Sequence, residues 1–188
     1  MSNFKTLAKL ILVLSLVFFL LFQSQGEVSA NLTGFKFVST NPCIVVQTGN
    51  TVIQQAVTNM VNDYNNKSHV HPVRCLDYNP NYNTIYIQDY YAADGNGART
   101  TDYAASGNTC PNAYDCNYSS LAVVAYVQIN TYYYFDQNYA NFMLLHEFGH
   151  AVGLAHANVC NDTVMNTCRW AYQTLQPYDI NDLNTLYP

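Results

Sequence analysis

One eleven-residue segment constrains the fold of this chain more than any other feature. Residues 146–156 fit the pattern H-E-x-x-H-x-x-G-x-x-H. Residues four apart are neighbours on a helix, so His146 and His150 would project from one face, one turn apart. Gly153 tolerates the left-handed dihedrals at which helices end, so the chain can turn there and bring His156 back. The segment therefore predicts a helix, a stop and a return that gather three imidazoles.

Three gathered imidazoles indicate a metal centre. Three protein ligands leave the fourth position of a tetrahedral Zn²⁺ open for water, as catalytic zinc requires. Glu147 follows the first ligand and can act on that water as a general base. We therefore expect one catalytic zinc ion on His146, His150 and His156. A chance match to this pattern should occur in on the order of one in 10⁵ chains of this size.

The first thirty residues have the pattern of an export signal. Lys5 and Lys9 precede an apolar run over residues 10–22, and Val28-Ser29-Ala30 follows. Small residues at the first and third positions before a cut are those that signal peptidase accepts, so we place cleavage after Ala30. The run is about 13 residues long, short of the roughly 20 that span a bilayer. We expect 1–30 to be removed and the mature protein to be secreted, with no stable membrane association.

Six cysteines support an oxidising compartment. An even number of cysteines behind a signal peptide indicates three disulfides, although fifteen pairings are open. Proximity in the sequence favours joining the last four in neighbouring pairs, which leaves the first two for each other. The cysteines are Cys43, Cys75, Cys110, Cys116, Cys160 and Cys168.

The balance of charged residues disfavours nucleic acid as a partner. The chain has 7 Lys and Arg against 12 Asp and Glu, a net charge of −5, which disfavours a nucleic-acid surface. Calcium is left open, because Asp94, Asp102 and Asp115 lie in stretches rich in Gly and Asn where Ca²⁺ could bind. Their spacing matches no calcium motif, and solvated loop aspartates are the alternative.

The periodicity of apolar residues predicts a mixed α/β fold. Residues 51–65 and 137–153 show helical spacing, and Pro177 opens a short C-terminal helix. Residues 84–89 and 121–130 have strand patterns. Between them, Gly95, Gly97 and Gly107 indicate a long loop. No linker or repeat interrupts residues 31–188, so we expect one domain, and a monomer.

The zinc pattern resembles the signature of the metzincin metalloendopeptidases. That family places a methionine turn shortly after the third histidine, and Met165 stands at a suitable distance. Residues 179–187 are similar to the final helix of the matrixins, the members that the chain resembles most, whereas astacins carry Tyr where this chain has Thr167. The resemblance implies a zincin-like α/β domain with a twisted mixed sheet, an N-terminal helix, an active-site helix and a short C-terminal helix.

The resemblance also implies an activity, which is the hydrolysis of peptide bonds in peptide or protein substrates. Leu121–Asn130 is similar to the strand along which matrixins bind substrate, which would make Val127 and Ile129 substrate-binding residues. Tyr172 and Tyr178 would contribute to the wall of the pocket for the residue after the cut. The alternative is a secreted binding or inhibitory module with this fold and weak catalysis.

Overall fold

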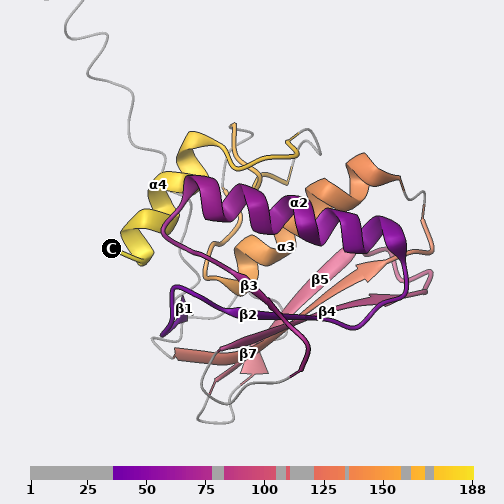
Figure 1. The fold of residues 1–188 in the computed structure, drawn as a ribbon. Helices are drawn as coiled ribbons and strands as arrows, with labels where there is room; N and C mark the ends of the chain where they lie inside the picture. The colour runs from indigo at the N-terminus through magenta and orange to yellow at the C-terminus, as the bar shows by residue number, and fades with distance from the viewer. Residues whose placement is uncertain are drawn as a thin grey trace, which may run out of the picture.

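The computed structural model describes residues 36–77, 83–104, 109–110, 121–133, 136–157, 162–167 and 172–188. The predicted signal peptide and three cysteines (Cys116, Cys160 and Cys168) lie outside these residues, and Cys110 is described only as part of a strand. The described residues form a mixed α/β fold, in agreement with the fold class expected from the sequence (Figure 1).

The described strands belong to one mixed sheet with the order β3-β2-β4-β7-β5-β6, and β1 pairs with the start of β7. Strands β1, β2, β3, β4 and β7 pair in parallel, whereas β5 runs antiparallel to β7 and β6 antiparallel to β5. The strands are β1 (Lys36–Phe37), β2 (Cys43–Val46), β3 (Val73–Cys75), β4 (Thr84–Tyr90), β5 (Ala98–Ala104), β6 (Thr109–Cys110) and β7 (Leu121–Asn130).

The helices of the described chain are α2 (Thr51–Lys67), α3 (Gln137–Ala151) and α4 (Pro177–Leu186). Figure 1 shows α2 and α3 on the same face of the sheet, with α4 beside one end of α2. Tyr64 of α2 and Phe148 of α3 meet edge to face, with ring centroids 4.7 Å apart. Both rings are fully buried, so this contact lies in the core between the two helices.

The N-terminus of α2 shows how a local signal sets a helix boundary. Asn50 is the cap, and its side-chain oxygen accepts hydrogen bonds from the N–H groups of Val52 and Ile53. A capping asparagine satisfies donors that the first helical turn leaves without partners. The helix therefore begins at Thr51, as the periodicity predicted, and it ends two residues later than predicted.

Strand β4 shows why the helices cover only one face of the sheet. Ile85 and Ile87 are fully buried, while Tyr86 and Gln88 between them are half-buried. Successive side chains of a strand point to opposite faces, so the isoleucines face the helices. On the other face, Tyr86 stacks on Tyr126 of β7 with ring centroids 5.1 Å apart.

Strand β5 corrects the sequence prediction of a long loop. Its residues pair with β7 from Ala98 to Ala104, with a register irregularity after Tyr103. Thr100 and Asp102 are buried on one face of this strand. Gly95 and Gly97 both precede the first residue of this strand, so the loop that they indicated is shorter than predicted. Asp102, which we considered as a loop residue for calcium, is therefore a strand residue.

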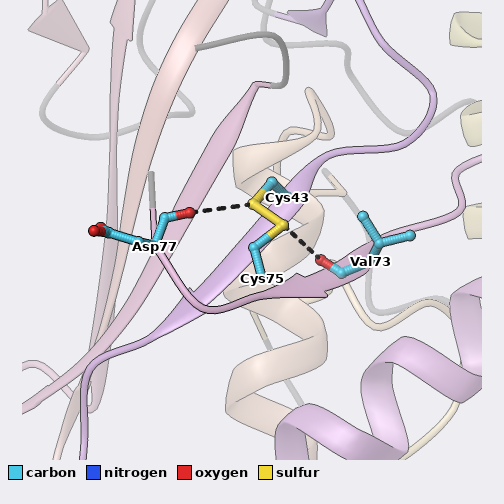
Figure 2. The surroundings of a disulfide bond; sticks show 4 residues. All are labelled: Cys43, Val73, Cys75 and Asp77. Atoms are coloured by element: carbon cyan, nitrogen blue, oxygen red, sulfur yellow. Dashed lines mark hydrogen bonds between the residues drawn. A yellow bond between two sulfur atoms is a disulfide. The ribbon is translucent and has the colours of Figure 1, made fainter. Parts of the chain in front are cut away.

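A disulfide closes the opposite edge of the sheet. Cys43 of β2 is bonded to Cys75 of β3, which confirms the expected pairing of the first two cysteines (Figure 2). The carbonyl oxygens of Asp77 and Val73 lie 3.9 Å from the two sulfurs. The bond spans 32 positions of the sequence, and α2 lies within the loop that it closes.

Among the described residues, none of the helices combines the length and the apolar character needed to cross a membrane.

Candidate metal centre

The end of α3 directs the chain toward the site. Gly153 has φ of +104°, and its N–H donates to the His150 carbonyl at 3.0 Å. The Leu154 N–H donates to the Gly149 carbonyl at 2.9 Å. These two bonds form a Schellman motif, in which a left-handed residue after the helix reverses the chain. A side chain at position 153 would be strained, so this glycine is what allows the chain to turn toward His156.

The rings of the two helical histidines are held by main-chain carbonyls. Nδ1 of His146 lies 2.7 Å from the Val164 carbonyl oxygen, and Nδ1 of His150 lies 2.8 Å from the Leu154 carbonyl oxygen. A carbonyl only accepts, so each Nδ1 carries the proton and donates it. Each neutral ring therefore keeps a lone pair on Nε2. Hydrogen bonds of this kind orient metal-binding histidines in many proteins.

The three Nε2 atoms converge on one point. Each of the three distances between the Nε2 atoms of His146, His150 and His156 is 3.1 Å. Two nitrogens bound about 2.0–2.1 Å from one tetrahedral zinc ion lie about 3.3–3.4 Å apart, close to these distances. At least the two helical histidines present lone pairs here, and facing lone pairs repel unless a cation lies among them. The donor set therefore fits a zinc ion.

Burial keeps the two helical imidazoles neutral. Removal from water lowers the pKa of His146 to about 4, although its hydrogen bond to the Val164 carbonyl opposes this. Burial also holds the pKa of His150 well below the ordinary value, and the neighbouring histidines add to the shift. A neutral imidazole is the form that binds a metal ion. The protein therefore presents these ligands ready for a cation at neutral pH.

Glu147 lies beside the first histidine and contacts the edge of the sheet. Its carboxylate is almost fully buried, and burial raises its pKa to about 7, against the opposing effect of a hydrogen bond from Thr100. The Thr100 hydroxyl lies 2.7 Å from Oε2 and 2.8 Å from the main-chain oxygen of Glu147. A carboxyl group with a pKa near the working pH can both take and release a proton, which suits a general base and acid.

Met165 lies in a turn packed beneath α3. Its side chain is fully buried, and a Cβ placed on Gly149 would lie 2.5 Å from the Met165 sulfur. The glycine between the two helical histidines therefore makes room for the methionine. The Met165 carbonyl accepts a hydrogen bond of 3.0 Å from the Ala157 N–H, next to the third histidine. The turn thus contacts α3 through the Met165 side chain and the segment after His156 through the Met165 carbonyl.

Asp179 at the start of α4 holds this turn from the other side. Its carboxylate accepts hydrogen bonds from the Thr163 hydroxyl, from the Val164 N–H at 3.1 Å and from the Gln176 N–H at 2.8 Å. Val164 is the residue whose carbonyl holds the His146 ring. A chain of contacts therefore runs from α4 through the turn to the first histidine.

The structure corrects the substrate strand that the sequence predicted. Strand β7 pairs with β1 and β4 along one side and with β5 along the other, so neither of its edges can add a peptide. Val127 and Ile129 are also buried, with exposed fractions of 0% and 1%. They belong to the core under α3 and not to a substrate surface, because β7 lies inside the sheet.

The two tyrosines expected in the pocket wall lie on or near α4. The Tyr172 hydroxyl donates to the Asp162 carboxylate, and the Tyr172 side chain packs against the core. Tyr178 is in the first turn of α4, with 38% of its surface exposed. Their contact with substrate stays a prediction.

Sequence reasoning missed Thr100, the residue that contacts Glu147. Three of the four residues from 100 to 103 are Thr or Tyr, which strands favour, and this could have indicated a strand. The neighbouring glycines favoured a loop instead. No local pattern shows which strand residue meets which helix residue 47 positions away.

Neither a protein-family model nor a curated protein matches the chain. Among solved structures, the fold is similar to two of myroilysin. The first is 11% identical, with a TM-score of 0.48, over 81% of this chain and 82% of that one. The second is 12% identical, with a TM-score of 0.47, over 88% and 96%.

A third similar structure is high choriolytic enzyme 1, a hatching enzyme zinc-protease from Oryzias latipes (medaka fish). It is 11% identical, with a TM-score of 0.46, over 87% of this chain and 96% of that one. These structures give the matrixin part of the resemblance no support. The likeness carries no residue role to this chain, so the function proposed below depends on the site itself.

Proposed function

We propose that this protein is a zinc-dependent endopeptidase of the metzincin type. One observation carries the proposal, namely that two buried imidazoles and one half-buried imidazole converge with Nε2 atoms 3.1 Å apart while a buried carboxylate, Glu147, follows the first of them. His146, His150 and His156 would hold the zinc ion. An ion there supplies a Lewis acid that makes water more acidic and polarises a carbonyl group.

Glu147 performs the proton transfers in this proposal. Its carboxylate takes a proton from the attacking water and later delivers it to the nitrogen of the leaving amine. The number of protons balances, because hydrolysis adds one water across the peptide bond. The buried setting of Glu147 supports this role, since a carboxyl with a pKa raised to about 7 exchanges protons near neutral pH.

The substrate would bind along the outer edge of β5. Within the described residues, β6 pairs with β5 only at Asp102 and Tyr103, so residues 98–101 have no neighbouring strand on that side. An extended peptide can add to such an edge through main-chain hydrogen bonds. Thr100 in this stretch contacts Glu147, so a peptide bound there would lie beside the proposed base.

The wider setting is also part of the proposal. Residues 1–30 would be a signal peptide, and residues 31–188 would form one secreted, monomeric catalytic domain. The Cys43–Cys75 bond supports an oxidising compartment. The likeness of residues 179–187 to the final helix of matrixins stays a prediction.

A pair of measurements tests the function. The purified protein should cleave a broad peptide library, and phenanthroline should abolish cleavage while added zinc restores it. Glu147→Gln should bind zinc with unchanged stoichiometry but lose at least about 100-fold in kcat, the scale of general-base catalysis. Retained turnover in Glu147→Gln would exclude the base role. A wild-type protein that binds zinc and peptides without cleaving them would instead favour a binding or inhibitory module.

A further inference from the structure

A single hydroxyl joins the edge strand to the proposed base. Thr100 of β5 has 3% of its surface exposed, and its Oγ1 lies within hydrogen-bond distance of two oxygens of Glu147. One is Oε2 of the carboxylate, and the other is the main-chain carbonyl oxygen. Among the residues that the structure describes, no other side chain makes a hydrogen bond to the Glu147 carboxylate. Thr100 is therefore the anchor that the structure provides for this carboxylate.

Only the contact with Oε2 can orient the carboxylate, since the other contact is with the main chain. A hydroxyl has one proton to donate and two lone pairs that accept. It can donate to Oε2 when the carboxylate is charged. Its single proton can go to only one of the two oxygens at a time, and the 2.7 Å contact with Oε2 is the one that orients the carboxylate.

We propose that Thr100 is a positioning residue that holds the Glu147 carboxylate in the orientation needed for proton transfer. The proposal rests on the peptidase function proposed above and extends it to a residue on a different element. Thr100 loses no proton and touches no substrate through its side chain. Its main chain belongs to the open stretch of β5, so the element that binds the peptide also holds the base.

Matched substitutions test this role by kinetics. Thr100→Val keeps the shape of the side chain and removes the hydroxyl, so kcat should fall roughly 10- to 100-fold, the range for a lost hydrogen bond to a charged group. KM should change by less than about twofold, because the main chain of β5 is unaltered. Thr100→Ser restores a hydroxyl and should recover most of the loss. Wild-type kcat in Thr100→Val, or no recovery in Thr100→Ser, would overturn the proposal.

A control variant separates positioning from the general loss of a hydroxyl. The Thr58 hydroxyl of α2 donates to the Gln54 carbonyl at 3.1 Å, so it makes only a main-chain contact of the kind that Thr100 also makes. Thr58→Val should leave kcat and KM unchanged. A fall in kcat equal to that of Thr100→Val would attribute the effect to packing and would contradict the proposal.

A second measurement needs no activity. In the metal-free protein, Thr100→Val should raise the equilibrium constant for unfolding about tenfold in the wild-type background. In a Glu147→Met background, which lacks the acceptor, the same change should raise it less than about threefold, and the difference is the coupling between the two side chains. Equal effects in both backgrounds would show that the hydroxyl serves only the main chain. Absent hydrolysis by the wild-type protein would reject the peptidase function alone, while this cycle would still decide whether Thr100 holds Glu147.

Discussion

The imidazole of His146 shows how a single residue is prepared for metal binding. Its position on α3 follows from local helical spacing, but its Nδ1 proton is held by the Val164 carbonyl, 18 residues later in the chain. That contact leaves Nε2 free to face the other two histidines. Burial keeps the ring neutral by lowering its pKa to about 4. Ligand identity is therefore local, whereas ligand orientation depends on a distant turn.

Asp102 is a buried residue whose ionisation should weaken the fold. Neither of its carboxylate oxygens has a hydrogen-bond partner in the described chain, and burial raises its pKa well above the ordinary value. The folded protein thus keeps this carboxyl protonated at pH values where the unfolded chain, with a pKa near 3.9, has released the proton. The contribution of Asp102 to stability should be greatest below that unfolded value and should be lost as the pH rises through the folded value.

Asp102→Asn should reduce this dependence on pH. The variant has no proton to lose at this position, so its free energy of unfolding should fall less steeply above about pH 4 than that of the wild type. Urea denaturation at several pH values from about 3 to 8 measures the two slopes. Below the unfolded pKa the side chain is neutral in both proteins, which provides an internal control. Parallel pH profiles would show that folding does not change the pKa of Asp102 and would contradict the prediction.

Helix α4 supports the three-histidine cluster without supplying a histidine to it. Asp179 is fully buried in its first turn and accepts the hydrogen bonds that hold Thr163 and Val164. Gln176 at the N-cap and Pro177 at the first helical position set the start of the helix. The helix therefore supports the cluster through an intervening turn, and strand β5 supports Glu147 in a similar way through Thr100.

Asp179→Ala should loosen the centre from a distance. The variant leaves the Val164 N–H and the Thr163 hydroxyl without their acceptor. The turn that orients His146 should therefore become less ordered. We expect zinc affinity to fall about 10- to 100-fold, the usual cost of losing an indirect support of a ligand. Competition with a zinc-binding dye measures this change. Asn181→Ala, an exposed change on the same helix, should leave the affinity unaltered; an equal loss there would indicate unfolding of α4 instead.

At the scale of the whole molecule, the sheet separates a structural edge from a functional edge. The disulfide joins β2 and β3 at one side, and β5 with Thr100 lies across β4 and β7 from it. Helix α3, which carries His146, Glu147 and His150, packs together with α2 on one face of this sheet (Figure 1). Global stability and local geometry of the site should therefore respond to different substitutions.

Removing the disulfide tests this separation. Cys43→Ala with Cys75→Ala should lower the free energy of unfolding by about 3–4 kcal/mol, as expected from loop entropy for a crosslink spanning 32 positions. Zinc affinity at a temperature where the variant is folded should stay within about twofold of the wild type. Denaturation and zinc titration of the same sample measure both. A parallel loss of affinity would mean that the crosslink supports the metal centre directly.

The sequence alone determined the elements whose signals are local. Helical periodicity located α2 and α3 to within two residues at each end, Pro177 marked the start of α4, and Leu121–Asn130 was predicted with its observed bounds. The gathering of three histidines was predictable for the same reason, because His146 and His150 lie one helical turn apart and Gly153 turns the chain toward His156. Tertiary structure decided what depends on pairing between distant segments. It placed β7 inside the sheet, left residues 98–101 of β5 without a neighbouring strand on their outer side among the described residues, and brought Thr100 to Glu147 and Asp179 to the turn below His146. Strand order and side-chain contacts across tens of residues arise from burying a common core, and no local pattern of residues specifies them.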